Sequence, residues 1–214
     1  PIAKLLNIHK GNRLVSLTSM ASKAVGLHSW IAAHKSDDAD LMGRAFTQGD
    51  VVTTMIKCAH GETILLIHDT TLPRPYSRGL RIQGTKGAWM EDNHSLYIEG
   101  VSEPHTWEPT DKYRETYEHP LWKDYQAKGV RGGHDGMDYL VFRAFVESVK
   151  NGTGVPIDIY DAAAWMAVTC LSEESIALGG APVAFPDFTG GEWIHRRPGP
   201  VSKYALDRIC GELF

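Results

Sequence analysis

A histidine among glycines is the first candidate for chemistry in this chain. His134 follows Gly132 and Gly133, precedes Gly136 by two residues, and stands just ahead of an apolar pattern with helical spacing. Glycine tolerates backbone angles that other residues avoid, so such a loop can bend sharply, swing or let a ligand approach its backbone. We therefore interpret the segment as a candidate catalytic loop that presents an imidazole. The alternative is a flexible helix entry with an exposed histidine.

A proline-stiffened segment, residues 73–78, is the second candidate. Two prolines fix their φ angles on either side of Arg74, so the segment should present Tyr76 at a defined place. A phenol held in this way can donate a hydrogen bond to a sugar hydroxyl or to a reacting oxygen. The alternatives are a loop whose Tyr76 packs on the sheet edge, and surface charges at Arg74 and Arg78.

Several other patterns do not support a site. Residues 84–87 lack the upstream glycine of a phosphate-binding loop, and residues 152–154 lack the third glycine of a dinucleotide-binding turn. No two of the ten histidines share a helix at metal-ligand spacing, and no Gly-x-Ser-x-Gly elbow is present. We therefore expect no metal site, no nucleotide fold and no serine hydrolase in this chain.

Some single residues have structural interpretations. His68 ends a strand that we expect to be buried, where a histidine is more often satisfied by core partners than by a ligand. Asp138 and Asp161 lie in or beside first turns of helices, where capping alone could explain a carboxylate. The three cysteines, which are Cys58, Cys170 and Cys210, are odd in number and widely spaced, which favours buried thiols.

Composition narrows the function classes. The 214 residues are 43% hydrophobic, which is ordinary for a soluble globular domain. The net charge of −4 gives no excess of positive charge that would attract the phosphates of nucleic acid. No run of residues is long and apolar enough to span a membrane, and the chain does not start like a signal peptide. We expect neither nucleic acid nor a membrane as a partner, and localisation stays open.

The first half of the chain predicts an antiparallel meander. Residues 13–20 and 51–58 alternate with strand period, and His60-Gly61 separates the second of these from residues 63–67 as in a hairpin. Short strands are also expected at residues 80–83, 88–90 and 95–98.

The second half predicts a long connection and then helices. Residues 103–133 are rich in proline, charge and aromatics, which is typical of a long decorated loop. Helical spacing then runs from Met137 to Asn151, and a second helix from Asp158 to Leu178 carries alanines suited to close packing on a sheet. The predicted fold class is α+β, an open antiparallel or mixed sheet with helices packed on one face.

Seven segments in order carry a resemblance that none carries alone. They are residues 49–54 (GDVVTT), 61–66 (GETILL), 73–78 (PRPYSR), 83–87 (QGTKG), 132–138 (GGHDGMD), 160–165 (YDAAAW) and 186–189 (PDFT). The chain thereby resembles the C-terminal domain of glycoside hydrolase family 109, the NAD-dependent α-N-acetylgalactosaminidases among the glucose-fructose oxidoreductase-like proteins. The resemblance covers residues 1–193, the expected substrate and catalytic domain, and leaves residues 194–214 as a C-terminal arm.

The resemblance implies a two-domain enzyme whose N-terminal Rossmann domain, absent from this chain, holds most of the NAD. In the family, NAD takes hydride from C3 of the sugar, the ketone acidifies the C2 proton, elimination expels the aglycone, water adds and hydride returns. No carboxylate pair at glycosidase separation is then required. The implied partners are a carbohydrate substrate, that Rossmann domain and a further copy of the chain through the sheet.

The resemblance also assigns residues. His134 matches the histidine of the family's Gly-Gly-His-Gly-Gly loop, the catalytic acid/base, and Tyr76 matches a tyrosine that contacts the sugar, with Arg74 beside it as a substrate-binding candidate. Asp135 departs from the family glycine and should stiffen the loop. A further family histidine would fall before Pro1, so we expect the isolated chain neither to bind NAD usefully nor to hydrolyse glycosides.

Two other functions stay open at this point. One is a sugar or cyclitol dehydrogenase of the same superfamily, which would accumulate NADH. The other is a non-enzymatic module used for oligomerisation, which the lack of a nucleotide fold in the chain supports.

Overall fold

The computed structural model describes residues 2–197 and 202–205. The chain divides into two compact units, the first made of Pro1–Leu72 with Leu140–Phe214 and the second of Pro73–Tyr139. No helix in the described part of the chain is both long and apolar enough to cross a membrane.

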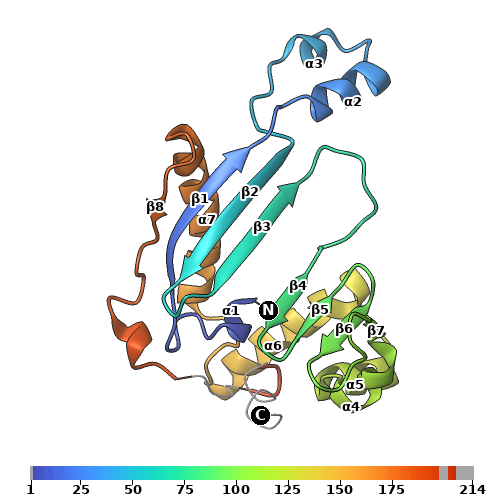
Figure 1. The fold of residues 1–214 in the computed structure, drawn as a ribbon, viewed down its shortest axis with the longest axis vertical. Helices are drawn as coiled ribbons and strands as arrows, with labels where there is room; N and C mark the ends of the chain where they lie inside the picture. The colour runs from blue at the N-terminus through green and yellow to red at the C-terminus, as the bar shows by residue number, and fades with distance from the viewer. Residues whose placement is uncertain (1, 198–201, 206–214) are drawn as a thin grey trace. The chain divides into compact units, whose positions relative to one another are not determined.

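The first unit is built on one antiparallel sheet with strand order β3-β2-β1-β8 (Figure 1). Its strands are β1 (Leu14–Ala21), β2 (Val51–Cys58), β3 (Thr63–Asp69) and β8 (Val183–Ala184). Its helices are α1 (Ile2–Leu5), α2 (Gly26–His34), α3 (Ala39–Gly43), α7 (Ile159–Ala177), most of α6 (Met137–Asn151) and the 3-10 turn Glu192–Ile194.

Strand alternation directs one face of this sheet into the core. Thr54, Ile56 and Cys58 of β2 are buried, whereas Met55 and Lys57 between them are exposed. The predicted alternation and hairpin are confirmed, because β2 pairs with both β1 and β3 in antiparallel register.

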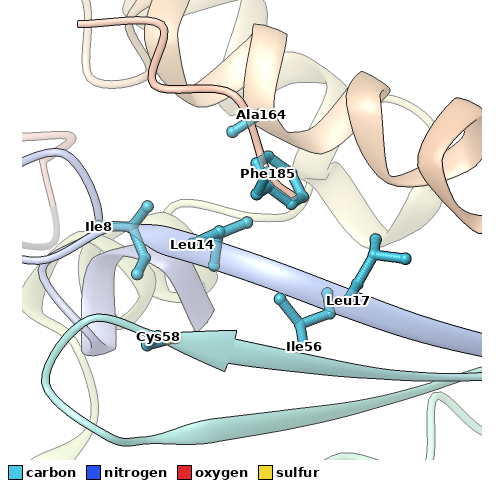
Figure 2. Close-up of a cluster of buried hydrophobic side chains, with 7 residues drawn as sticks. All are labelled: Ile8, Leu14, Leu17, Ile56, Cys58, Ala164 and Phe185. Carbon is cyan, nitrogen blue, oxygen red and sulfur yellow. The ribbon is translucent and has the colours of Figure 1, made fainter. Parts of the chain in front are cut away.

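Helix α7 covers the buried face along β1. Asp158 caps its start by accepting a hydrogen bond from the Asp161 backbone N–H at 3.0 Å, as the sequence predicted. Figure 2 shows the buried cluster between the helix and the strands, formed by Ile8, Leu14, Leu17, Ile56, Cys58, Ala164 and Phe185. Burying each large aliphatic side chain contributes about 1.5–3 kcal/mol, so this contact holds the first unit together.

The second unit has its own antiparallel sheet, with strand order β4-β5-β6-β7. The strands are β4 (Arg81–Gly84), β5 (Gly87–Met90), β6 (Ser95–Ile98) and β7 (Glu108–Pro109), followed by α4 (Asp111–Tyr117), α5 (Pro120–Ala127) and the 3-10 turn His134–Gly136. The α+β class and the antiparallel strands are confirmed.

The strands form two sheets where the sequence suggested one meander. The proline-rich segment after β3 explains the break, since Pro73 and Pro75 have no backbone N–H to donate to a sheet ladder. Residues 103–133, expected as a long loop, contain β7, α4 and α5. Pro120 at the first turn of α5 and the His119 cap that accepts from the Leu121 N–H explain that start.

Two burial expectations are wrong. His68 is exposed, because β3 is an edge strand and α7 packs along β1 instead. Cys170 is exposed on α7, whereas Cys58 is buried as expected. Burial raises the pKa of the Cys58 thiol to about 11, so it stays protonated at neutral pH. Cys210 lies outside the described residues.

Candidate functional site

The glycine-rich loop enters α6 through a tight left-handed turn. His134, Asp135 and Gly136 have φ values of 50°, 54° and 91°, and form a single 3-10 turn. Positive φ is natural for glycine and costs strain in most other residues. Asp135 thus holds a conformation that suits glycine better than aspartate.

Tyr125 of α5 holds this loop in place through contacts with Arg131 and Gly136. Its side chain is only 6% exposed, its hydroxyl donates to the Arg131 carbonyl, and it accepts from the Arg131 N–H at 2.5 Å. The ring stacks on Tyr139 of α6 with a centroid distance of 5.7 Å. A Cβ at position 136 would overlap the Tyr125 ring, so only glycine fits there without rearrangement.

His134 has a carboxylate partner within hydrogen-bond distance. Its Nδ1 lies 2.9 Å from Oδ2 of Asp138, one helical turn later in α6. This hydrogen bond and the charge of Asp138 raise the pKa of His134, burial opposes the shift slightly, and Asp135 adds to it. The imidazole is largely exposed, so solvent screens the interaction, yet it can exchange protons near neutral pH.

Tyr76 is presented to solvent by the segment between β3 and β4. Its side chain is 85% exposed, so it does not pack on a sheet edge. Arg78 donates a hydrogen bond to the Tyr76 hydroxyl, which raises the pKa of Arg78. Glu91 and Asp135 shift the pKa of Arg78 in the same direction more weakly. Arg78 therefore links the tyrosine electrostatically to the histidine loop within the second unit.

Arg74 shapes its own loop in this structure. Its Nη1 donates to the carbonyl oxygens of Pro75 at 3.2 Å and Ser77 at 3.0 Å. The Ser77 hydroxyl in turn accepts from the Gly79 N–H at 2.7 Å and donates to Asp92. These hydrogen bonds stabilise the fold of the segment that carries Tyr76, so Arg74 has a structural role in that segment.

Sequence reasoning identified His134 and Tyr76 but missed two partners. Asp138 was interpreted as a helix-start carboxylate, and Arg78 as a surface charge. The four-residue spacing of His134 and Asp138 at a helix entry was the available signal, because side chains one turn apart share a helix face. Nothing in the local sequence marks Tyr125 as the anchor of the loop.

The described residues form neither a clustered metal site nor a dinucleotide-binding turn. No group of three or more His, Cys, Asp or Glu side chains among residues 2–197 and 202–205 is arranged to hold a metal ion. Over the same ranges, no strand runs through a Gly-x-Gly-x-x-Gly turn into a helix. The second unit thus offers acid–base and hydrogen-bonding side chains, and we assign no dinucleotide site to it.

Comparison with known proteins gives consistent results. Residues 1–195 match a family described as glycosyl hydrolase 109, C-terminal domain. An alpha-N-acetylgalactosaminidase of Tannerella forsythia is 50% identical over 198 residues, which cover 92% of this chain and 42% of that protein. A glycosyl hydrolase family 109 protein of Stenotrophomonas maltophilia is 50% identical over 199 residues, with coverage of 92% and 44%. The chain spans less than half the length of these relatives.

A solved structure supports the fold alone. The crystal structure of an oxidoreductase domain protein from Kribbella flavida aligns with a TM-score of 0.54 at 17% identity. The alignment covers 83% of this chain and 47% of that one.

Proposed function

This chain belongs to the family of glycosyl hydrolase 109 C-terminal domains, and from this premise we propose that it supplies the sugar-binding and acid–base groups of an enzyme that hydrolyses α-N-acetylgalactosaminides. Residues 1–193 would form the substrate and catalytic domain, with residues 194–214 as a C-terminal arm. The observation that carries the proposal is the exposed His134 imidazole, hydrogen-bonded to Asp138 and held on an anchored loop.

His134 is assigned the acid–base role on chemical grounds. An imidazole whose pKa is raised keeps a larger protonated fraction near neutral pH, so it can give a proton to a departing aglycone oxygen. The same nitrogen can take a proton from an incoming water. Tyr76, exposed and partnered by Arg78, would donate a hydrogen bond to a sugar hydroxyl. Arg74 would contribute mainly by holding the Tyr76 loop in shape.

The proposed chemistry also requires NAD. When bound to the enzyme, NAD would supply reversible hydride transfer at the sugar. Because residues 2–197 and 202–205 contain no dinucleotide-binding turn, we propose that a separate nucleotide-binding domain holds most of the NAD, and that the 214-residue chain alone does not hydrolyse glycosides. The substrate, that domain and NAD are the partners that the proposal requires.

The test is hydrolysis of an aryl α-N-acetylgalactosaminide by the complete gene product with NAD. We expect His134→Ala to lower kcat about 100-fold or more, the usual effect of losing a general acid–base group. His60→Ala is the matched control, because His60 is an exposed histidine in the β2–β3 turn of the other unit. Tyr76→Phe should weaken substrate binding more than turnover.

Each other outcome is informative. Turnover by His134→Ala equal to that of the unmodified enzyme would remove His134 from the acid–base role. Accumulation of NADH would instead indicate the dehydrogenase alternative. Release of N-acetylgalactosamine by the purified 214-residue chain would contradict the need for a separate cofactor domain.

A further inference from the structure

Asp138 determines which imidazole nitrogen of His134 carries the proton. The 2.9 Å hydrogen bond joins Nδ1 of His134 to Oδ2 of Asp138. An ionised carboxylate only accepts hydrogen bonds, so Nδ1 must be the donor and must keep its hydrogen in the neutral imidazole. The lone pair is then on Nε2. Nε2 is therefore the atom that can accept and return a proton.

Gly133 makes room for this contact. Its backbone, with φ −73° and ψ 168°, is open to any residue, so left-handed strain does not explain glycine at this position. A Cβ on residue 133 would lie 2.9 Å from Oδ2 of Asp138, closer than real Cβ contacts allow. The nearest obstacle is the same carboxylate oxygen that holds His134. A side chain at 133 would require that oxygen to move from its present position.

The remaining charged groups near the pair act differently. Asp135 follows His134 directly and affects its pKa less than Asp138 does. Arg78 interacts with Asp135 and with the Tyr76 hydroxyl. Within residues 2–197 and 202–205 the imidazole of His134 makes its carboxylate hydrogen bond with Asp138 and none with Asp135, so Asp138 has the geometry to select a tautomer.

We propose that Asp138 is a positioning residue that holds His134 in the Nδ1–H tautomer, so that Nε2 performs proton transfer, and that Gly133 leaves room for the Asp138 carboxylate beside the imidazole. The inference rests on the proposed function only for its catalytic consequence. The tautomer itself is a property of this chain and can be measured without any activity.

The experiment is ¹⁵N NMR of the His134 ring in the 214-residue chain across a pH titration. The unmodified chain should show the Nδ1–H tautomer in its neutral form. Asp138→Ala should shift the tautomer ratio toward Nε2–H by roughly two- to fivefold, as expected for loss of one exposed charge-assisted contact. It should also lower the pKa of His134, because the carboxylate that stabilises the imidazolium is gone.

Three further variants separate the causes. Asp138→Asn removes the charge and adds an amide that can either accept from or donate to Nδ1, so the pKa of His134 should fall and the preference for the Nδ1–H tautomer should weaken. Gly133→Ala should shift the tautomer ratio as Asp138→Ala does, although both partners remain. Asp135→Asn is the matched control, because it removes the neighbouring charge and should leave the tautomer unchanged.

An unchanged tautomer ratio in both Asp138→Ala and Gly133→Ala would overturn the proposal. In the complete gene product, Asp138→Ala should lower kcat and leave KM within about twofold, because the group acts on proton transfer. If the gene product proves to have no glycosidase activity, the proposed function fails while the NMR result still decides the role of Asp138.

Discussion

At the scale of single residues, the first unit contains a buried ionisable pair that the proposed chemistry does not use. His9 is 3% exposed, and neither ring nitrogen has a hydrogen-bond partner in the described part of the chain. Burial lowers the pKa of His9, and the charge of Asp161 opposes that shift. For Asp161, also 3% exposed, burial and then the charge of Asp158 raise the pKa. Both groups are thus held toward their neutral forms.

This burial predicts a specific pH dependence of stability. Because the pKa of His9 in the folded state lies below its ordinary value of 6.5, the unfolded chain binds the proton first as the pH falls. The His9 contribution is therefore fully present above pH 6.5 and is lost as the pH falls toward the folded-state pKa. Asp161 has the opposite sign, since a raised carboxyl pKa favours the fold at low pH and the benefit is lost as the pH rises.

We expect His9→Asn to flatten the fall in the free energy of unfolding between about pH 7 and about pH 5.5. Asparagine does not titrate, and it tolerates the left-handed φ of 63° at this position. Urea denaturation at several pH values measures the slope. His60→Asn, at an exposed histidine, should keep the slope of the unmodified chain, and parallel profiles for His9→Asn and the unmodified chain would contradict the prediction.

At the scale of elements, α5 and the start of α6 contact both ends of the loop between them. Tyr125 of α5 bonds to Arg131 at one end of the loop, lies against Gly136 at the other end, and stacks on Tyr139. The loop is rich in glycine, yet it is held at both ends. Its glycines serve close packing as well as positive φ.

Replacing Gly136 should reveal these contacts. The methyl group added by Gly136→Ala would overlap the Tyr125 ring, at a position whose φ is 91°. Gly129→Ala would strain a similar φ of 86°, but no atom lies within 4 Å of the added methyl group. We expect Gly136→Ala to lower the free energy of unfolding by about 1–3 kcal/mol more than Gly129→Ala, the range for overpacking. Urea denaturation of the two variants gives the difference. Equal losses would mean that Tyr125 does not restrain the loop.

At the scale of the whole molecule, α7 packs on the buried face of the first unit's sheet, and the opposite face carries exposed apolar side chains. In the register of β2 with β3, Met55 lies opposite Leu65 and Thr53 lies opposite Ile67. In the register of β2 with β1, Thr53 also lies opposite Met20. The four apolar side chains share one face and are exposed. Contiguous exposed apolar surface favours association with a further protein surface.

We therefore expect the chain to self-associate through this face. Sedimentation velocity over a concentration series should show a rising mean mass, and Ile67→Lys should shift the chain toward monomer, because a buried unpaired charge opposes association. Val101→Lys is the control, since Val101 is similarly exposed but lies in the second unit. A monomer at all concentrations, or equal effects of both lysines, would exclude this face as the interface.

Local patterns were sufficient for β1, β2, β3, α6, α7 and the family, but not for α4 and α5, which lie where a long loop was expected. The alternation in β2, the Asp158 cap of α7 and the ordered family segments each depend on neighbours within a few residues, so the sequence alone determined them. His134 and Tyr76 were identified in the same way, as a histidine among glycines and a tyrosine between prolines. Their catalytic roles stay predictions.

Tertiary structure decided which faces are covered and which side chains meet. The exposure of His68 and Cys170 depends on α7 lying along β1, and the two separate sheets depend on the chain between β3 and β4. Tyr125 meets Arg131, Gly136 and Tyr139, and no local pattern indicated these contacts. Burial and contact are set by residues distant in the chain, and the local sequence does not carry that information.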